Sequence, residues 1–399
     1  MKILLVNSLY YPHVIGGAER SVQLLVESLR DLGDEVTVLT TAEEASEGVV
    51  NGVPVHYLRV PNIYWMPNAA KQPRYRKLIW HVLDSKNPTA TKDIRSVLER
   101  VKPDLVHTNN LAGLSVSVWS AARKLGIPVV HTVRDHYLMC IRGFMFHRGV
   151  QCARQCGLCR MISMPRKGVS TKINAAVGVS RFILDKHLDG GFFRNVPIQT
   201  HIHSSVPDLP TGQPHKVTGR EVVFGFVGQF TLGKGIEYLL RNFSRIPVGG
   251  GRLRVFGKSL DPAYNLRLRE VFAGPSIEFM GHRPLEEIYS QVDVVVVPSL
   301  GDDAFPRAVI EAFAYGRPVI ATMRGGAAEV VVEGKTGYLF EPNSIDQFED
   351  RLRRFIDKPE LVADFSPHCL EQAAQLSGEA VAEKYRDIYR SVLAQHISH

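Results

Sequence analysis

The sequence predicts an α/β protein made of two similar domains. Short aliphatic runs, such as ILLVN (3–7) and VTVLT (36–40), alternate with segments of helical spacing, as expected for parallel strands joined by crossover helices. The alternation stops at residues 206–221, VPDLPTGQPHKVTGRE, which are rich in Pro, Gly and Thr, and then resumes. We therefore expect one α/β domain on each side of a linker.

The first domain should open with a strand, a helix and a second strand. Between the two opening runs, residues 21–32 place Val22, Leu25, Val26 and Leu29 at helical spacing. Further helices are expected near residues 111–125 and from Ser180, and further strands in three runs: DLVHTN, PVVHTV and AAVGVS.

The second half repeats this pattern. Six runs are expected to form its strands: VVFGFVG, RLRVFG, SIEFMG, DVVVVPS, PVIAT and TGYLF. A long helical pattern then runs from about Cys369 to Gln395. The predicted organisation is an amino-terminal domain at 1–205 with a Cys- and Arg-rich loop at 140–168, a linker at 206–221, a second domain at 222–375, and a C-terminal helix at 376–399 that returns to the first domain.

Composition favours an ordinary globular protein. The chain has 399 residues, of which 45% are hydrophobic and 22% charged, so sizeable cores are expected. No apolar run reaches the roughly 18 residues of a membrane span. The start, MKILLVNS, is typical of a buried strand rather than a signal peptide. We expect a cytoplasmic protein that is at most peripheral on the inner face of a membrane.

Charge is distributed unevenly along the chain. Residues 1–200 contain 26 Lys and Arg against 15 Asp and Glu, a net charge of +11, whereas the remainder contains 22 against 25, a net charge of −3. A basic half indicates either an anionic partner or a solvated basic surface. Nucleic acid is not the expected partner, because the basic residues lack an ordered set of aromatic side chains on which bases could stack.

Glu311 is an isolated carboxylate in an apolar segment. It follows the nearly continuously apolar run at 293–299, which is typical of a central parallel strand, and a turn leads from that run into a helix beginning near Phe305 or Pro306. A buried carboxylate needs hydrogen-bond donors. Ribose hydroxyls would supply two, and a salt bridge to Arg307 or Arg317 is the alternative.

Gly16 and Gly17 lie in the loop between the first strand and the first helix. Glycines there allow the backbone to approach a diphosphate, and the helix amino end offers unpaired N–H groups. We therefore consider this loop a candidate phosphate site, with an ordinary turn as the alternative.

Several motifs in one order resemble glycosyltransferase family four. Asp303 and Glu311, separated by seven residues, precede AFAYGRPVIAT and GGAAE, and YYPHVIGGAERSVQLLVESL, HTVRDHYLMC, FVGQFTLGKGIEYLL and GKTGYLFEP extend the resemblance along nearly the whole chain. The resemblance implies a GT-B fold, in which two Rossmann-like domains face each other across a cleft. It also implies a retaining enzyme that uses a nucleotide-diphosphate sugar.

The resemblance assigns donor-side roles. Glu311 would bind the ribose, Asp303 the sugar hydroxyls, and Lys234 the diphosphate, so no catalytic metal is expected. The implied donor-binding residues are Gly16, Gly17, Gln229, Lys234, Phe305, Pro306, Arg307 and Glu311. The implied catalytic residues are Asp303, Lys234, Asp135 and Arg134.

Four positions depart from the family pattern. Gln229 replaces a usual arginine, and Arg134 stands where a histidine is common and cannot accept a proton. Asp135, His131 or His136 would then contact the acceptor. Asp303 is one methylene shorter than the usual glutamate. Pro306 lacks the amide hydrogen of the glycine found in many members, although proline also occurs in a common variant of this segment.

The resemblance therefore implies a hexosyl-type transferase that moves a sugar to a glycan or lipid-linked acceptor, in surface polysaccharide or glycolipid synthesis. Two alternatives remain open. A non-catalytic nucleotide-sugar-binding scaffold would explain Gln229 and Arg134, and a GT-B sugar-nucleotide epimerase would use a similar donor site.

Four cysteines cluster at Cys140, Cys152, Cys156 and Cys159. In a cytoplasmic protein this spacing indicates either a structural zinc site or reduced thiols in a loop. The same segment contains Arg142, Arg148, Arg154, Arg160, Arg166 and Lys167. We expect this basic loop to meet an anionic acceptor, such as a diphosphate-linked lipid at a membrane surface.

Overall fold

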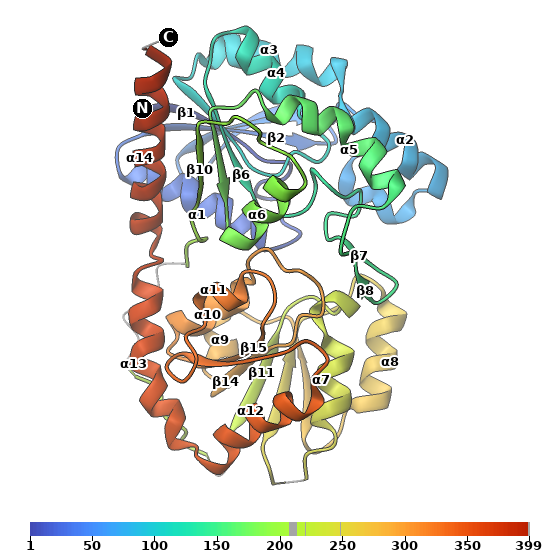
Figure 1. Ribbon diagram of the computed structural model, residues 1–399, viewed down its shortest axis with the longest axis vertical. Coiled ribbons are helices and arrows are strands. Elements are labelled where there is room, and N and C mark those ends of the chain that lie inside the picture. The colour runs from blue at the N-terminus through green and yellow to red at the C-terminus, as the bar shows by residue number, and fades with distance from the viewer. Residues whose placement is uncertain (207–213, 220, 248, 398–399) are drawn as a thin grey trace. The chain divides into compact units, whose positions relative to one another are not determined.

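The computed structural model describes residues 1–206, 214–219, 221–247 and 249–397 (Figure 1). The chain forms two compact units. The amino-terminal unit comprises Met1–Met145, Cys152–Ser205 and Gly378–His399, and the carboxy-terminal unit comprises Phe146–Gln151 and Val206–Ser377. Half of the predicted linker at 206–221 lies outside the described residues, because 207–213 and 220 belong to the undescribed part.

The amino-terminal unit contains a sheet with the strand order β10-β9-β6-β5-β1-β2-β4-β3. All neighbouring strands are parallel except β3, which pairs antiparallel with β4. The strands are β1 (Lys2–Val6), β2 (Glu35–Ala42), β3 (Ser46–Val50), β4 (Val53–Arg59), β5 (Leu105–Thr108), β6 (Val129–Val133), β9 (Ala175–Gly178) and β10 (Ile198–His201).

Crossover helices connect these strands, as parallel pairing requires. They are α1 (Gly17–Asp31), η1 (Met66–Lys71), α2 (Arg74–Ser85), α3 (Pro88–Val101), α4 (Ser117–Lys124), α5 (Gly157–Ser170) and α6 (Arg181–Asp189), with α14 (Gly378–Ile397) joining from the chain's end. Several begin at predicted signals. Ser180, for example, caps α6 by accepting a hydrogen bond from the Ile183 amide at 3.2 Å.

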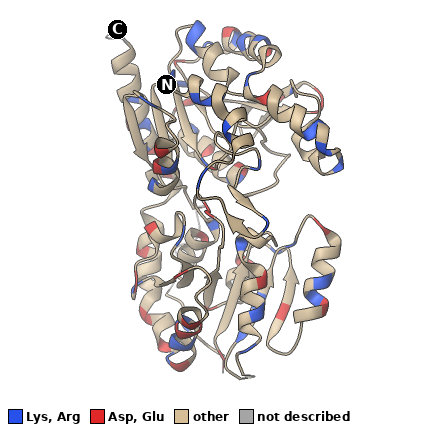
Figure 2. Ribbon diagram, turned by 45° about the vertical axis from the view of Figure 1, so that its right-hand side comes forward, with Lys and Arg blue, Asp and Glu red and all other residues tan. Residues whose placement is uncertain are grey.

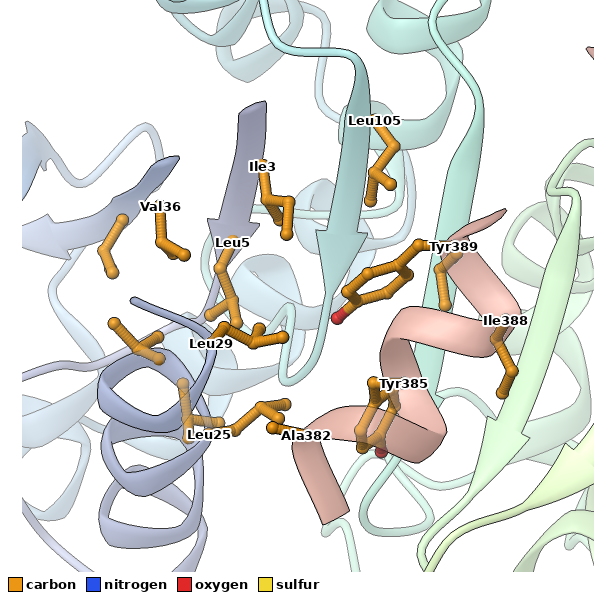
Figure 3. Packing of buried hydrophobic residues seen from close by; sticks show 14 of the residues in the cluster. Ile3, Leu5, Leu25, Leu29, Val36, Leu105, Ala382, Tyr385, Ile388 and Tyr389 are labelled. Carbon is orange, nitrogen blue, oxygen red and sulfur yellow. The ribbon is translucent and has the colours of Figure 1, made fainter. Parts of the chain in front are cut away.

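The last helix completes the core of the amino-terminal unit. Tyr385 and Tyr389 of α14 are buried in one cluster with Leu25 and Leu29 of α1 and residues of β1 and β5 (Figure 3). The Tyr389 hydroxyl also hydrogen-bonds to His107 Nδ1 at 2.6 Å. The last helix of the chain therefore completes a core that begins at the first strand of the chain.

The carboxy-terminal unit contains a parallel sheet with the order β13-β12-β11-β14-β15-β16. Its strands are β11 (Val223–Val227), β12 (Arg252–Phe256), β13 (Ile277–Gly281), β14 (Val294–Val297), β15 (Val319–Thr322) and β16 (Gly337–Phe340), and a separate hairpin is formed by β7 (Phe146–His147) and β8 (Val150–Gln151). Its helices are η2 (Leu232–Lys234), α7 (Ile236–Phe243), α8 (Pro262–Phe272), α9 (Leu285–Tyr289), α10 (Arg307–Ala314), α11 (Ala327–Val330), α12 (Ile345–Asp357) and α13 (Glu360–Ala374).

The predicted α/β class with two Rossmann-like domains is confirmed, and two local expectations need correction. The single helical pattern expected from Cys369 to Gln395 is divided between α13 and α14, which are separated at residues 375–377. The region predicted as a loop at 140–168 contains the β7–β8 hairpin and most of α5. No helix in the described part of the chain is long and apolar enough to cross a membrane.

Candidate functional site

The carboxy-terminal unit has a topological switch point between β11 and β14. Strand order runs outward through β12 and β13 on one side and through β15 and β16 on the other. In such sheets, the loops after the two central strands diverge and leave a place for a ligand at the carboxyl ends. Residues 228–235 follow β11 and residues 298–306 follow β14, and these two loops carry Asp303 and four of the eight predicted donor-binding residues.

Lys234 and Asp303 form an ion pair at this point. Lys234 ends the short turn η2, where the Thr231 side chain accepts a hydrogen bond from the Lys234 amide at 3.3 Å. Its ammonium contacts Asp303 Oδ2. The Lys234 side chain is 39% exposed and that of Asp303 18% exposed, so both remain accessible to a ligand. The sequence placed both residues in the site, and the structure brings them together.

Close backbone packing fixes the two loops. Gly235 has φ +72°, and a Cβ atom on it would lie 1.8 Å from the Pro298 carbonyl oxygen. Gly325 has φ +63°, and its Cβ would lie 2.1 Å from the Asp303 carbonyl oxygen. Both positions therefore require glycine. Gly235 allows the Lys234 loop to pack against the loop after β14, and Gly325 allows the loop after β15 to pack against Asp303.

Glu311 is buried within α10 and pairs with Arg307. Glu311 Oε1 lies 2.9 Å from Arg307 Nε and 2.9 Å from Arg307 Nη2, one helical turn earlier. Its Oε2 accepts a longer bond of 3.4 Å from the Tyr289 hydroxyl. Burial and the Glu311 charge raise the Tyr289 pKa well above its ordinary value. The salt bridge considered as the alternative for Glu311 is thus present, and Oε2 is the more weakly bonded oxygen.

Arg317, the other partner considered for Glu311, has a different role. Its guanidinium donates to the backbone carbonyls of Tyr289 at 2.7 Å, Val292 at 2.9 Å and Tyr315 at 2.5 Å. Burial lowers its pKa to about 10. Arg317 therefore joins the segments around α9 and α10 rather than neutralising the glutamate.

The remaining donor-side residues flank the pair. Phe305 is buried, and Pro306 is the N-cap of α10, which begins one residue later at Arg307. Because Pro306 has no amide hydrogen, the first N–H groups of the helix come from the residues after it. Gln229 is exposed at the end of β11. It lies on the switch-point loop but has no charge with which to hold a phosphate.

Sequence reasoning missed Gln151, which fixes the neighbouring Asp302. The Gln151 side chain donates to Asp302 Oδ2 at 2.8 Å and accepts from the Asp302 amide at 2.8 Å. Gln151 belongs to the β7–β8 hairpin. This hairpin is part of the carboxy-terminal unit, although the rest of that unit begins only at Val206. No local pattern marks a residue whose partner is 151 positions away.

The amino-terminal unit has its own switch point between β1 and β5. Gly16 is the N-cap of α1 in the loop after β1, and its amide donates to Glu19 Oε2 at 2.8 Å. A carboxylate therefore already occupies part of this helix end, where the helix dipole favours negative charge. A diphosphate at Gly16 and Gly17 would have to share the site with Glu19.

Arg134 and Asp135 follow β6 in the same unit. Arg134 Nε donates to Asn109 Oδ1 at 2.8 Å, and Nη1 contacts Ser204 Oγ at 3.3 Å. Asp135 Oδ1 accepts from the Tyr137 amide at 2.7 Å, yet burial raises the Asp135 pKa to about 6, with a smaller contribution from the Glu19 charge. These two residues remain partly exposed, whereas His131 and His136 are buried.

The four clustered cysteines are all free thiols in the amino-terminal unit. Cys140 and Cys159 are buried with their sulfurs 3.9 Å apart. Cys156 caps α5, and backbone N–H groups of Cys159 and Leu158 lower its pKa, whereas burial raises the Cys159 pKa to about 12. Among the described residues, no three of these sulfurs lie within 4.8 Å of one another.

Comparisons with known proteins agree with this architecture. Residues 16–199 match the family model of the glycosyl transferase 4-like domain, and residues 212–369 match that of glycosyl transferases group 1. A Klebsiella pneumoniae protein described as "Uncharacterized 42.6 kDa protein in cps region" is 33% identical over 83% of this chain and 87% of its own length. The D-inositol 3-phosphate glycosyltransferase of Corynebacterium aurimucosum is 25% identical over 96% of this chain and 92% of its own.

Solved structures share the fold over 98% of this chain. Sucrose-phosphate synthase from Thermosynechococcus elongatus has a TM-score of 0.74 at 20% identity and is covered over 99% of its length. Anabaena HepE, solved in complex with UDP-glucose, has a TM-score of 0.71 at 16% identity, and the match covers 100% of its length. Two family models in sequence order, a relative one-third identical and these shared folds establish that the chain is a glycosyltransferase of the family-four type with a GT-B fold.

Proposed function

We propose that this protein is a retaining glycosyltransferase that moves a sugar from a nucleotide-diphosphate sugar to a glycan or lipid-linked acceptor. The observation that carries the proposal is the Lys234–Asp303 ion pair at the switch point of the carboxy-terminal unit. A cation at this place can stabilise the diphosphate that leaves, and an adjacent carboxylate can accept hydrogen bonds from sugar hydroxyls.

Glu311 would bind the ribose of the donor. Its Oε2 accepts a single bond of 3.4 Å from Tyr289, so it can still accept a hydroxyl, whereas a second ribose hydroxyl at Oε1 must compete with Arg307. The first turn of α10 would present its amides to the donor phosphates. The amino-terminal unit would contribute Arg134 and Asp135 on the acceptor side.

Transfer with retention needs no side-chain nucleophile in this proposal. The acceptor hydroxyl attacks the anomeric carbon on the face that the diphosphate leaves, and a phosphate oxygen of the leaving group takes the acceptor proton. Lys234 then stabilises the nucleoside diphosphate that is released. No metal ion enters these steps.

The relatives support the substrate class. HepE was solved with UDP and with UDP-glucose, and the Klebsiella relative is described as lying in a cps region. We therefore place the activity in surface polysaccharide or glycolipid synthesis. A nucleotide-sugar-binding scaffold is the second candidate, because Gln229 adds no charge to the diphosphate site and Arg134 cannot accept a proton.

Nucleotide binding tests the proposal directly. UDP, GDP, ADP and their sugars would be titrated calorimetrically, without added metal, into the wild type, Lys234→Ala, Glu311→Ala and the control Lys358→Ala. Lys358 is an exposed lysine at the C-terminal end of α12, outside the loops that follow β11 and β14. We expect one nucleotide to bind, with affinity reduced about 100-fold by loss of Lys234 and about 10-fold by loss of Glu311, since hydrogen bonds to charged groups contribute about 1.5–3 kcal/mol each.

The control should bind like the wild type. Equal affinity of all four proteins for the nucleotide would show that Lys234 and Glu311 do not bind it. Donor binding without release of nucleoside diphosphate in the presence of a polysaccharide acceptor pool would favour the scaffold. The anomeric configuration of the product, read by NMR, decides between retention and inversion.

A structural zinc ion in the cysteine cluster is a separate proposal. Four thiolates around zinc, with Zn–S distances of about 2.3 Å, have sulfurs about 3.8 Å apart. The Cys140–Cys159 separation of 3.9 Å fits one edge of that tetrahedron, and Cys152 and Cys156 would have to turn toward it. Elemental analysis of the purified protein should find about one zinc per chain, and Cys159→Ser should remove it.

A further inference from the structure

Two helices of the amino-terminal unit carry apolar side chains toward solvent. These helices, α2 and α5, are neighbours, since the Ser85 hydroxyl of α2 donates to the Ile162 carbonyl of α5 at 2.8 Å. Their exposed apolar residues, called here the α2/α5 face, are Tyr75, Leu78, Ile79, Val82 and Leu83 on α2 and Leu158, Met161 and Met164 on α5. Isolated exposed apolar residues are common, but a continuous set on two adjacent helices marks an interaction site.

The α2 residues lie along one side of the helix. Tyr75, Ile79 and Val82 are separated by four and three positions, the spacing that places side chains on a common face. Ile79 is 47% exposed and Val82 54% exposed. The opposite side holds the buried Trp80 and Asp84. A helix on the surface of a globular protein ordinarily turns its apolar side inward and its polar side outward.

Helix α5 also exposes apolar side chains to solvent. Leu158, Met161 and Met164 recur every three residues on its exposed side, and the two methionines are 62% and 64% exposed. The buried side is mixed, since Ser163 and the charged Arg166 lie there together with Cys159, Ile162 and Val169. Flexible methionine side chains adapt to irregular apolar surroundings such as acyl chains.

A buried ion pair fixes these orientations. Arg166 Nη2 lies 3.2 Å from Asp84 Oδ2, with the two side chains 1% and 0% exposed. Arg166 Nη1 also donates to the Tyr137 carbonyl at 2.6 Å, and the Gly113 amide donates to Asp84 Oδ1 at 2.8 Å. Rotating either helix to hide its apolar side would separate a buried pair, which is strongly unfavourable.

The solvent-accessible charges of these two helices are positive (Figure 2). They are Arg74, Arg76 and Lys77 on α2 and Arg160 and Lys167 on α5, whereas Asp84, the one carboxylate on the two helices, is buried. Arg74, Arg154 and Arg160 are exposed and make no ion pair with any described residue. A second copy of the chain would bring like charges together here, whereas anionic lipid headgroups would pair with them.

We propose that the α2/α5 face docks the protein on an anionic lipid bilayer. The apolar side chains enter the boundary between headgroups and acyl chains, and the flanking Arg and Lys side chains contact lipid phosphates, which is the arrangement of helices that lie in a membrane interface. The docking proposal does not depend on the donor chemistry.

Vesicle co-sedimentation without donor tests the proposal. The wild type should bind phosphatidylglycerol-containing vesicles and bind pure phosphatidylcholine vesicles at least about tenfold more weakly, because each basic residue near an anionic surface adds attraction. The apolar variant Ile79→Ser/Met161→Ser and the charge variant Arg74→Glu/Arg160→Glu should each lose at least about tenfold in partitioning. High salt should weaken wild-type binding.

Matched controls separate docking from general effects. Val49→Ser removes an apolar residue that is 70% exposed on β3, and Lys92→Glu/Lys124→Glu removes exposed lysines from α3 and α4 of the same unit. Both should bind vesicles within about twofold of the wild type. An Ile79→Trp reporter should shift its emission to shorter wavelength on anionic vesicles, since the indole then leaves water.

Three outcomes would overturn the proposal. The first is that the wild type does not bind anionic vesicles at low salt, and the second is that both face variants bind as well as the wild type. The third is that light scattering finds a wild-type dimer that Ile79→Ser/Met161→Ser dissociates, because the face would then be a contact between copies. Nucleotide titration of the same variants, expected to be unchanged, shows whether each is folded and keeps this result distinct from a failure of the proposed transferase.

Discussion

Both units place loops at a switch point of a parallel sheet, but they use polar residues differently. In the amino-terminal unit polar side chains form buried networks: His107 hydrogen-bonds to Tyr389 and to Thr132, and Arg166 pairs with Asp84. In the carboxy-terminal unit the Lys234–Asp303 pair is partly exposed.

The difference separates two roles of charge. A buried pair that also bonds to backbone groups holds helices in place and is unavailable to a ligand, whereas a partly exposed pair can exchange its partner for a phosphate or a sugar hydroxyl. The amino-terminal unit therefore uses its charges inside for its fold and leaves basic residues outside for association. The carboxy-terminal unit also buries Arg317 for its fold, but it keeps the Lys234–Asp303 pair where a ligand can reach it.

Acid should distinguish the two units most strongly. Burial lowers the pKa of five histidines in the amino-terminal unit. The pKa falls to about 3 for His131 and His187 and to about 4 for His81 and His136. The His107 pKa falls well below the ordinary 6.5. Because their folded pKa values lie below the unfolded value, the unfolded state binds more protons, and stability is lost as pH falls below about 6.5.

Two carboxyls act in the opposite direction. Burial raises the pKa of Asp84 and Asp135 to about 6, so protonation favours the folded state between about pH 4 and 6. Five imidazoles outnumber these two groups. The described histidines of the carboxy-terminal unit, by contrast, are not buried. Hydrogen exchange from pH 7 to about 4.5 should show protection lost first in the amino-terminal unit; simultaneous loss in both would contradict this.

Arg166→Met should have the next largest effect. It leaves the Asp84 carboxylate buried without its cation, which should cost about 3–5 kcal/mol of unfolding free energy in denaturant titrations. Adding Asp84→Asn should recover most of the loss, because no charge then stays buried. The matched change in the other unit, Arg307→Met, should cost less, since the Glu311 side chain is 9% exposed whereas that of Asp84 is 0% exposed. Equal losses would show that the two pairs do not differ as described.

Tyr389→Phe should have the smallest effect of the three. It removes the hydroxyl bonded to His107 Nδ1 at 2.6 Å and leaves that buried nitrogen unpaired. This should lower the unfolding free energy by about 1–2 kcal/mol. Tyr289→Phe is its counterpart in the carboxy-terminal unit, where the hydroxyl makes only long bonds of 3.4 and 3.5 Å. Thermal unfolding should show a clear decrease in Tm for the first and little for the second. The reverse order would place the stronger network in the carboxy-terminal unit.

The sequence predicts what depends on local pattern. Strands such as β1 and β14 are predicted because both of their faces are buried, which produces continuous apolar runs. The burial of Glu311 follows from its apolar neighbours, and Arg307 was one of two partners foreseen. The choice between Arg307 and Arg317 was not predictable, because the carbonyls that bind Arg317 come together only in the folded chain.

Residues with distant partners escaped sequence reasoning. Helix α5 was predicted as part of a loop, since Gly157, Pro165 and Gly168 weaken helical signals. Arg166 is one of the basic residues of the segment expected to meet an anionic acceptor, but its partner Asp84 lies 82 positions earlier and makes it a core residue. Gln151 carries no motif at all. In each case tertiary contacts, rather than local propensity, decide the residue's environment.

The return of α14 to the first unit has a consequence for biosynthesis. Tyr385 and Tyr389, which complete the core around Leu25 and Leu29, are translated after the whole of the carboxy-terminal sheet. A ribosome therefore releases the segment that begins the first core long before the segment that closes it. The second unit can finish folding first, and the first unit must wait for the last helix to emerge, with its apolar sheet face uncovered in the interval.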